Sequence, residues 1–320
     1  MLVGAAAVKR PRRAPTLSTE NCKTRAMICA LLLQTNPDAP ALLPFPLLLA
    51  AVGALGCVIG SFLNVVIHRV PRDESIVFPN SRCPECGAAI RAYDNVPVLS
   101  YLVLRGRCRA CRTPISARYP AVELVTGLLF ALTFAHDGLA PALPFDLIFV
   151  ASLVALVFID AEHMILPDVI TLPGLVVALV YRGLVPNLDG MNFMTAGLMA
   201  GWPAWAVSLF GALFGAAVGG GSLWLIGWLW ERLRGVEAMG LGDVKMMFMV
   251  GALLGWPRTV LTIFLAVILG SLAGVALMLR RRERNMQMLL PFGIFLGAGA
   301  LVSLLAGHAI INWYVGRFVP

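Results

Sequence analysis

The sequence predicts an all-α polytopic membrane protein with about eight transmembrane helices and a zinc-binding loop between the first two. Three observations predict this fold class. The 320 residues are 59% hydrophobic and only 13% charged, and the mean hydropathy of +0.84 is too high for a soluble domain. Uncharged apolar runs of membrane-spanning length recur along the chain. Arginine collects between these runs, as it does in the cytoplasmic loops of membrane proteins.

Residues 1–40 differ from the rest, because Lys and Arg alternate there with Pro and small residues. The apolar segment 27–33 is too short to span a bilayer, and no clear cleavage site for a signal peptidase follows it. We expect residues 1–40 to be disordered or a mis-assigned N-terminal extension. The predicted topology would place this basic segment on the outer side of the membrane, against the positive-inside rule, and translation from Met27 would remove that conflict. Residues 41–68 then form the first transmembrane helix, because no Asp, Glu, Lys or Arg occurs from Ala39 to Ile67.

An arginine-rich loop, residues 69–118, follows the first helix. The later helices are placed near 120–136, 142–160, 169–185, 207–230, 243–256, 259–279 and 289–312. The positive-inside rule puts the arginine-rich loop in the cytoplasm, together with the loops near 161–168, 231–242 and 280–288. The uncharged stretch 190–230 is long enough for two crossings, but polar and turn residues between Asn192 and Pro203 favour an interfacial first half. With one crossing there, Asp160 and Asp243 both lie at cytoplasmic helix ends.

Asp160 and Asp243 are the candidate catalytic residues. Asp160 follows an uncharged run of thirteen residues, 147–159, and Asp243 ends the segment Gly240-Leu241-Gly242-Asp243. An ionisable carboxyl at membrane depth is costly and marks a functional site. The two glycines loosen the helix, so that water and an extended peptide can approach. Two carboxyls that share a site hold one proton between them, so that one activates water while the other protonates a scissile carbonyl.

Other carboxyls have simpler interpretations. Asp168 follows Pro167 and precedes an apolar run, so we expect it to be a helix N-cap. Glu123 lies near the start of a predicted helix, where a structural and a substrate-lining role are both open. Glu162 and His163 lie just after Asp160 and are read as a solvated loop.

Four cysteines have the spacing of a metal site. Cys83 and Cys86 form one CxxC pair, Cys108 and Cys111 form another, and 21 residues separate the pairs. Four thiolates supply the tetrahedral set that zinc prefers, and a closed set of this kind is structural. Zn²⁺ would order a small loop that has too little core of its own. Disulfide pairs and free thiols are the alternatives.

Charge and motif order limit the remaining function classes. The net charge of +8 does not indicate a nucleic-acid partner, because the basic residues lie between apolar runs and form no stripe with aromatic residues. The lipid bilayer is the expected partner instead. A proton-coupled transporter would show inverted repeats, and no convincing repeat is present. A membrane anchor with a zinc module is a further alternative.

Six motifs, in this order and spacing, resemble the type IV prepilin peptidases, which are GxGD-type membrane aspartyl proteases. The motifs are Gly60–Arg69 (GSFLNVVIHR), Pro79–Cys86 (PNSRCPEC), Tyr119–Leu124 (YPAVEL), Ile159–Asp168 (IDAEHMILPD), Gly240–Lys245 (GLGDVK) and Pro291–Gly293 (PFG). The resemblance covers residues 55–315. It implies that the chain removes the basic leader from type IV prepilins and type II secretion pseudopilins, at the cytoplasmic face of the bacterial inner membrane. It also implies that Asp160 and Asp243 are the catalytic pair.

The same resemblance implies a second activity. Members of the family with the tetracysteine loop also N-methylate the new N-terminus and use S-adenosylmethionine as the methyl donor. We therefore expect both activities, with a peptidase that lacks methylation as the alternative. The S-adenosylmethionine site cannot be placed from the sequence. On this basis residues 69–118 form a cytoplasmic zinc domain associated with methylation, and residues 119–315 form the peptidase membrane domain.

Overall fold

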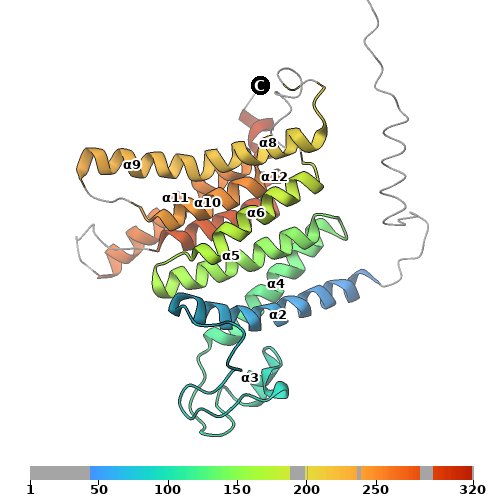
Figure 1. Cartoon of the computed structure of the whole chain (residues 1–320), viewed down its shortest axis with the longest axis vertical. Coiled ribbons are helices and arrows are strands. Elements are labelled where there is room, and N and C mark those ends of the chain that lie inside the picture. The colour runs from blue at the N-terminus through green and yellow to red at the C-terminus, as the bar shows by residue number, and fades with distance from the viewer. Residues whose placement is uncertain (1–43, 188–198, 200, 236–238, 282–290, 319–320) are drawn as a thin grey trace, which may run out of the picture. The chain divides into compact units, whose positions relative to one another are not determined.

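The computed structural model describes residues 44–187, 199, 201–235, 239–281 and 291–318. The chain divides into two compact units, residues 1–45 and 46–320. Nearly all of the first unit, and with it the expected N-terminal extension, lies outside the described residues. The expected interfacial segment 190–203 and the loops near 231–242 and 280–288 also lie wholly or partly outside them. The described part of the second unit is helical and contains no β-strand, apart from two isolated β-bridges in the cysteine loop (Figure 1).

Helices form at every apolar segment that the sequence predicts to be helical. The elements are α2 (Phe45–Arg69), η1 (Val70–Arg72), η2 (Ala92–Asn95), α3 (Leu99–Val103), α4 (Arg118–Asp137), α5 (Leu143–His163), α6 (Asp168–Leu184), α8 (Ala204–Ala216), the π-helical η3 (Ala217–Gly221), α9 (Ser222–Arg234), α10 (Leu241–Leu254), α11 (Trp256–Arg281) and α12 (Phe292–Phe318). The predicted helix 207–230 is therefore one continuous segment built from α8, η3 and α9. The all-α polytopic fold is confirmed.

Six helical segments among the described residues are long and apolar enough to cross a bilayer. They are Phe45–Arg72, Arg118–Asp137, Leu143–His163, Ala204–Arg234, Trp256–Arg280 and Phe292–Phe318. Helix α6 has 17 residues and α10 has 14. At a rise of about 1.5 Å per residue they extend about 26 and about 21 Å, less than the ~30 Å of a hydrocarbon core. The predicted number of eight crossings therefore stays a prediction.

Helix α10 is enclosed by other helices. It contacts α6, α8, α11 and α12, and nine of its 14 residues are buried. Helix α5 is buried in a similar way and contacts α4, α6 and α12. A helix that is apolar all round belongs in a core. The two candidate catalytic aspartates thus lie at the ends of the two helices that form the centre of the bundle.

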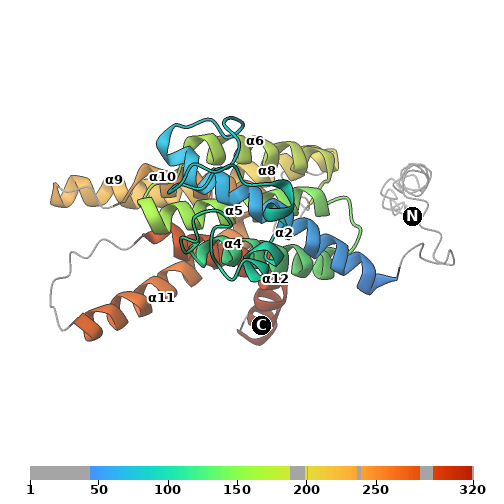
Figure 2. The same ribbon diagram turned by 90° about the horizontal axis from the view of Figure 1, so that it is seen from below.

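Helix α11 behaves differently. Its first half is packed, but no residue from Val267 to Arg280 is buried. Figure 2 shows this half of α11 diverging from the other helices. Its exposed side chains include Leu272 and Leu279, which are apolar. This half of the helix is suited to contact with lipid.

Polar contacts join several helices at one end of the bundle. Four contacts join helix ends there: Asn64 with Tyr119, Arg118 with Glu162, Lys245 with Asp168, and Asp160 with Ile294. The C-terminal ends of α2 and α5 therefore lie beside the N-terminal ends of α4, α6, α10 and α12. The cysteine loop, which contains α3, projects from α2 and α4 (Figure 1). Both candidate sites consequently belong to the same end of the bundle.

Candidate active site and metal centre

Asp160 lies near the end of α5, and its carboxylate meets the first turn of α12. The backbone N–H of Ile294 donates a hydrogen bond to Asp160 Oδ2 at 3.1 Å. Asp160 is only 5% exposed. A Cβ on Gly293 would lie 2.8 Å from the same oxygen, so only glycine allows this approach. The first N–H groups of a helix have no partner within the helix and attract negative charge. The start of α12 therefore binds and orients the Asp160 carboxylate.

Asp243 lies in the first turn of α10. Gly240 precedes this helix in an extended conformation, with φ −67° and ψ 140°. Leu166, from the segment after α5, packs between the first turns of α10 and α12. Its Cβ lies 2.9 Å from where a Cβ on Gly242 would be, and its Cδ1 lies 3.2 Å from where a Cβ on Gly293 would be. The missing side chains of these two glycines let α10, α12 and the end of α5 converge.

The structure thus brings Asp160 and Asp243 to one site. Gly242, next to Asp243, and Gly293, next to the Asp160 carboxylate, both lie against the side chain of Leu166. The two aspartates are 83 positions apart in the sequence. Two carboxyl groups at the converging ends of buried helices form an arrangement that can activate water and protonate a carbonyl. Their catalytic role stays a prediction.

The carboxyls of Asp168 and Glu123, the other acidic residues considered from the sequence, interact with groups other than Asp160 and Asp243. The predicted N-cap role of Asp168 is wrong, because Pro167 is the N-cap and Asp168 is the first residue of α6. The Asp168 carboxylate instead binds Lys245 Nζ, with its two oxygens at 2.8 and 2.7 Å. Glu123 is buried, and its Oε2 accepts a hydrogen bond from the backbone N–H of Val98 at 2.7 Å. Glu123 therefore holds the cysteine loop against α4.

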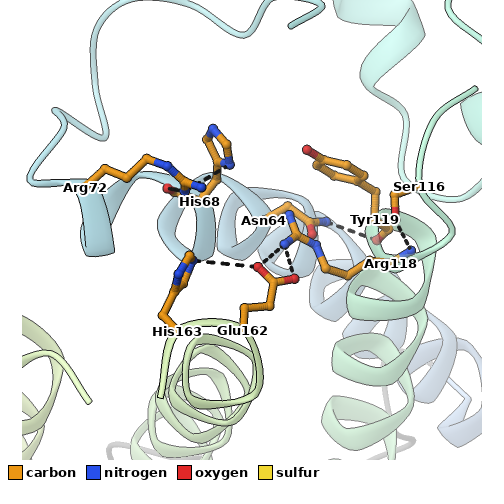
Figure 3. A network of polar contacts seen from close by, with 8 residues as sticks. All are labelled: Asn64, His68, Arg72, Ser116, Arg118, Tyr119, Glu162 and His163. Carbon is orange, nitrogen blue, oxygen red and sulfur yellow. Dashed lines mark hydrogen bonds and ion pairs between the residues drawn. The ribbon is translucent and has the colours of Figure 1, made fainter. Parts of the chain in front are cut away.

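A polar network links the end of α5 to α4 and α2 (Figure 3). One guanidinium nitrogen of Arg118, the first residue of α4, contacts both carboxylate oxygens of Glu162. Asn64 Nδ2 donates to the Tyr119 carbonyl at 3.0 Å. The expected loop at Glu162 and His163 is wrong, because both lie in the last turn of α5, although Glu162 is exposed to solvent as expected. No sequence signal pairs Arg118 with Glu162, since 44 positions separate them.

The four cysteines form a cluster that could hold a metal ion. Their sulfur atoms all lie within 4.8 Å of one another, and Cys83 Sγ lies 3.8 Å from Cys111 Sγ. A tetrahedral zinc site with Zn–S bonds of about 2.3 Å has sulfur atoms about 3.8 Å apart. The cluster therefore fits the predicted tetrathiolate ligand set.

The two CxxC segments repeat one backbone pattern, 25 residues apart. The equivalent contacts are Cys83 N to Ala88 O and Cys108 N to Thr113 O, Gly87 N to Cys83 O and Arg112 N to Cys108 O, and the bridges Arg82 with Ala89 and Arg107 with Pro114. Gly87 and Arg112 both have positive φ, +67° and +61°. Each segment thus folds into the same tight knuckle and directs its two thiols to one centre.

Side chains around the cluster support a metal-binding loop. The Thr113 hydroxyl lies 3.2 Å from Cys111 Sγ, close enough to hydrogen-bond a thiolate there. A thiolate is the form that binds a metal. Arg109 Nε lies 3.0 and 2.9 Å from the two Asp94 oxygens, and this ion pair lowers the pKa of Asp94. The second knuckle is thereby tied to the segment between the two knuckles.

Comparison with known proteins places the chain in a family. Two protein-family models match it: the bacterial peptidase A24 N-terminal domain at residues 54–136 and the type IV leader peptidase family at residues 147–275. A relative from Pseudomonas aeruginosa named prepilin leader peptidase/N-methyltransferase is 37% identical over 284 residues, which cover 82% of this chain and 91% of the relative. The chain belongs to the type IV leader peptidase family.

Two further relatives carry the same name. One from Burkholderia pseudomallei is 40% identical over 292 residues, covering 83% of this chain and 88% of the relative. One from Neisseria gonorrhoeae is 36% identical over 305 residues, covering 87% and 98%. No solved structure matches the chain significantly. The first matched region contains the four cysteines, and the leader peptidase match contains both Asp160 and Asp243.

Proposed function

We propose that this protein cleaves the leader peptide from prepilins and then methylates the new N-terminus. Membership of the type IV leader peptidase family supports the cleavage, and the shared name of the relatives supports both activities. The observation that carries the proposal is the convergence of Asp160 and Asp243 where α5, α10 and α12 meet. The proposed substrates are type IV prepilins and type II secretion pseudopilins.

The proposed cleavage uses the two aspartates as an acid/base pair. One carboxylate takes a proton from water, and the water oxygen attacks the scissile carbonyl carbon. The other carboxyl, protonated, donates its proton to the carbonyl oxygen. The C–N bond then breaks as the first carboxyl gives its proton to the leaving amine, and a hydroxyl of the tetrahedral intermediate returns a proton to the second carboxyl, so that both carboxyls regain their starting state. The hydrogen bond from Ile294 holds Asp160 in place during these steps.

The surroundings of the pair suit an extended peptide. A scissile bond has to lie in extended chain, because helical backbone shields its carbonyl from attack. Gly240 is extended and lies outside α10, and the segment from Met164 to Pro167 also lies outside the helices. Irregular backbone at membrane depth is stable where it lines a cavity or is enclosed by protein. These segments offer backbone groups with which a substrate strand could pair.

We propose that the four cysteines hold a structural zinc ion. When bound, zinc would cross-link the two knuckles and supply no chemistry to peptide hydrolysis, because a closed tetrathiolate set leaves no open position. S-adenosylmethionine is the proposed methyl donor, and we assign it no site. Residues 69–118 form the zinc domain associated with methylation, and residues 119–315 form the peptidase domain.

The proposed location is the bacterial inner membrane, with the site at the cytoplasmic face. The arginines of the cysteine loop lie at the same end of the bundle as Asp160 and Asp243, and arginine-rich loops remain cytoplasmic. A prepilin whose apolar helix lies in the bilayer would present its cleavage junction at this depth.

Mass spectrometry of a processed prepilin tests the proposal. The purified protein in lipid is incubated with a prepilin and S-adenosylmethionine. The expected product lacks the leader and carries one added methyl group. A processed product with an unmodified N-terminal amine would show that the protein is a peptidase without methylation activity. An intact prepilin would refute the proposed function.

A further inference from the structure

The segment that leaves the second cysteine knuckle leads directly into α4. Ile115 N donates to the Gly106 carbonyl at 2.7 Å, which closes the knuckle. Ser116 Oγ then accepts a hydrogen bond from Arg118 N at 3.3 Å, and α4 begins at Arg118. Only Ser116 and Ala117 separate the closed knuckle from Arg118. The position of Arg118 therefore depends on the folded knuckle.

Arg118 holds the end of α5. Its guanidinium contacts both oxygens of Glu162, which lies two residues after Asp160 (Figure 3). The helix ends immediately afterwards, where Met164 takes a left-handed conformation with φ +54° and donates its N–H to the Asp160 carbonyl at 2.9 Å. Terminal turns of helices fray unless side chains hold them. The Arg118–Glu162 ion pair therefore restrains the turn that carries Asp160.

Partial burial of both side chains and a hydrogen bond at the start of α4 strengthen the Arg118–Glu162 ion pair. The side chain of Arg118 is 20% exposed and that of Glu162 is 32% exposed, so solvent screens their attraction only in part. The neighbouring Tyr119 carbonyl accepts the hydrogen bond from Asn64 Nδ2, which fixes the start of α4 to α2. Arg118 thus acts from an anchored helix start, and its hold on Glu162 limits movement of α5.

We infer that Arg118 and Glu162 are positioning residues that couple the folded cysteine loop to the placement of Asp160. The inference rests on the proposed function of Asp160. Neither residue takes part in the chemistry. When the loop is disordered, the start of α4 keeps its contact with Asn64 but loses the support of the knuckle, so Arg118 is held less firmly, the last turn of α5 loosens and Asp160 leaves its productive position. The peptidase site would then be fully assembled only when the cysteine loop is folded.

Cleavage kinetics give the first test. We expect Arg118→Gln and Glu162→Gln each to lower kcat about tenfold with KM little changed, because misplacement by about 1 Å costs up to about 100-fold. The charge-reversed double variant Arg118→Glu/Glu162→Arg should recover most of the loss. Arg72→Gln is the matched control, since Arg72, in η1, lies at the same end and its guanidinium contacts His68 in the adjoining α2 and not α5. Single variants with wild-type kcat, or a double variant without recovery, would overturn the inference.

Hydrogen exchange of the segment 159–166 gives a second test that does not depend on activity. Arg118→Gln should speed exchange there, and so should Cys108→Ser, which breaks the cysteine cluster. Cys108→Ser should add no further increase in an Arg118→Gln background, because the link is already broken. If Arg118→Gln does not accumulate, Arg118→Lys replaces it and should give an intermediate effect, since lysine keeps the charge but loses the guanidinium that lies over the Tyr119 ring. Unchanged exchange in the variants would overturn the coupling, whereas a wild-type protein that cannot cleave prepilin would refute the proposed function.

Discussion

Gly293→Ala tests how α12 positions Asp160. The new Cβ would lie 2.8 Å from Asp160 Oδ2, whereas ordinary contacts begin at 3.4 Å. The carboxylate therefore has to retreat by about 0.6 Å, the difference between these two distances. A retreat directly away from α12 would lengthen the 3.1 Å hydrogen bond from Ile294 to about 3.7 Å, beyond hydrogen-bonding range.

The expected loss follows from that hydrogen bond. A hydrogen bond to a charged group contributes about 1.5–3 kcal/mol, which corresponds to about a 10- to 160-fold decrease in kcat. Initial rates of prepilin cleavage by the lipid-reconstituted protein measure the decrease. Gly316→Ala is the control in the same helix, because a Cβ there meets nothing within 4 Å, and it should cleave at the wild-type rate. Equal rates for Gly293→Ala and Gly316→Ala would refute the role of α12 in positioning Asp160.

Three further predictions concern the surrounding contacts. Asp168→Asn should retain cleavage and lose at most about 1 kcal/mol of unfolding free energy, because the ion pair of Asp168 with Lys245 is partly exposed. Abolished cleavage at normal expression would make Asp168 a catalytic candidate. Cys108→Ser should remove bound zinc, as measured by elemental analysis of the purified protein, and retention of wild-type zinc would contradict the tetrathiolate site. Arg112→Gly should retain zinc and resist chelators at least as well as wild type. Arg112 occupies the left-handed position that Gly87 takes in the other knuckle, and glycine adopts this conformation without strain. Faster zinc loss from the variant would contradict the equivalence of the two knuckles.

Much of the fold could be predicted because its signals are local. An apolar run long enough for a bilayer predicts a helix wherever it occurs, as for α5. The CxxC spacing predicts the cysteine cluster for the same reason, since each knuckle is set by neighbouring residues. The length of α10 could be predicted, since the expected helix 243–256 and the observed Leu241–Leu254 both have 14 residues, but its enclosure by other helices could not. Its apolar sequence is typical of a membrane crossing, but this helix is enclosed by its neighbours and need not span the bilayer.

The aspartates of the candidate site were identified from sequence, but their supporting contacts were not. A carboxyl at the end of an apolar run is visible in the sequence, and both Asp160 and Asp243 have this property. The contact of Asp160 with Ile294 joins residues 134 positions apart, and the Arg118–Glu162 pair joins residues 44 positions apart. Such pairs depend on how the helices pack, which hydropathy and motif spacing do not encode. For the same reason, Asp168 was expected to cap its own helix when its partner is Lys245.

Prepilin processing in membranes tests the two-aspartate mechanism most directly. Wild type, Asp160→Asn and Asp243→Asn are expressed to equal levels, and the products are analysed by mass spectrometry. The mechanism predicts that wild type releases the leader and that neither variant does, because each lacks one half of the acid/base pair. Leader release by either variant would contradict the assignment of Asp160 and Asp243 as the catalytic pair.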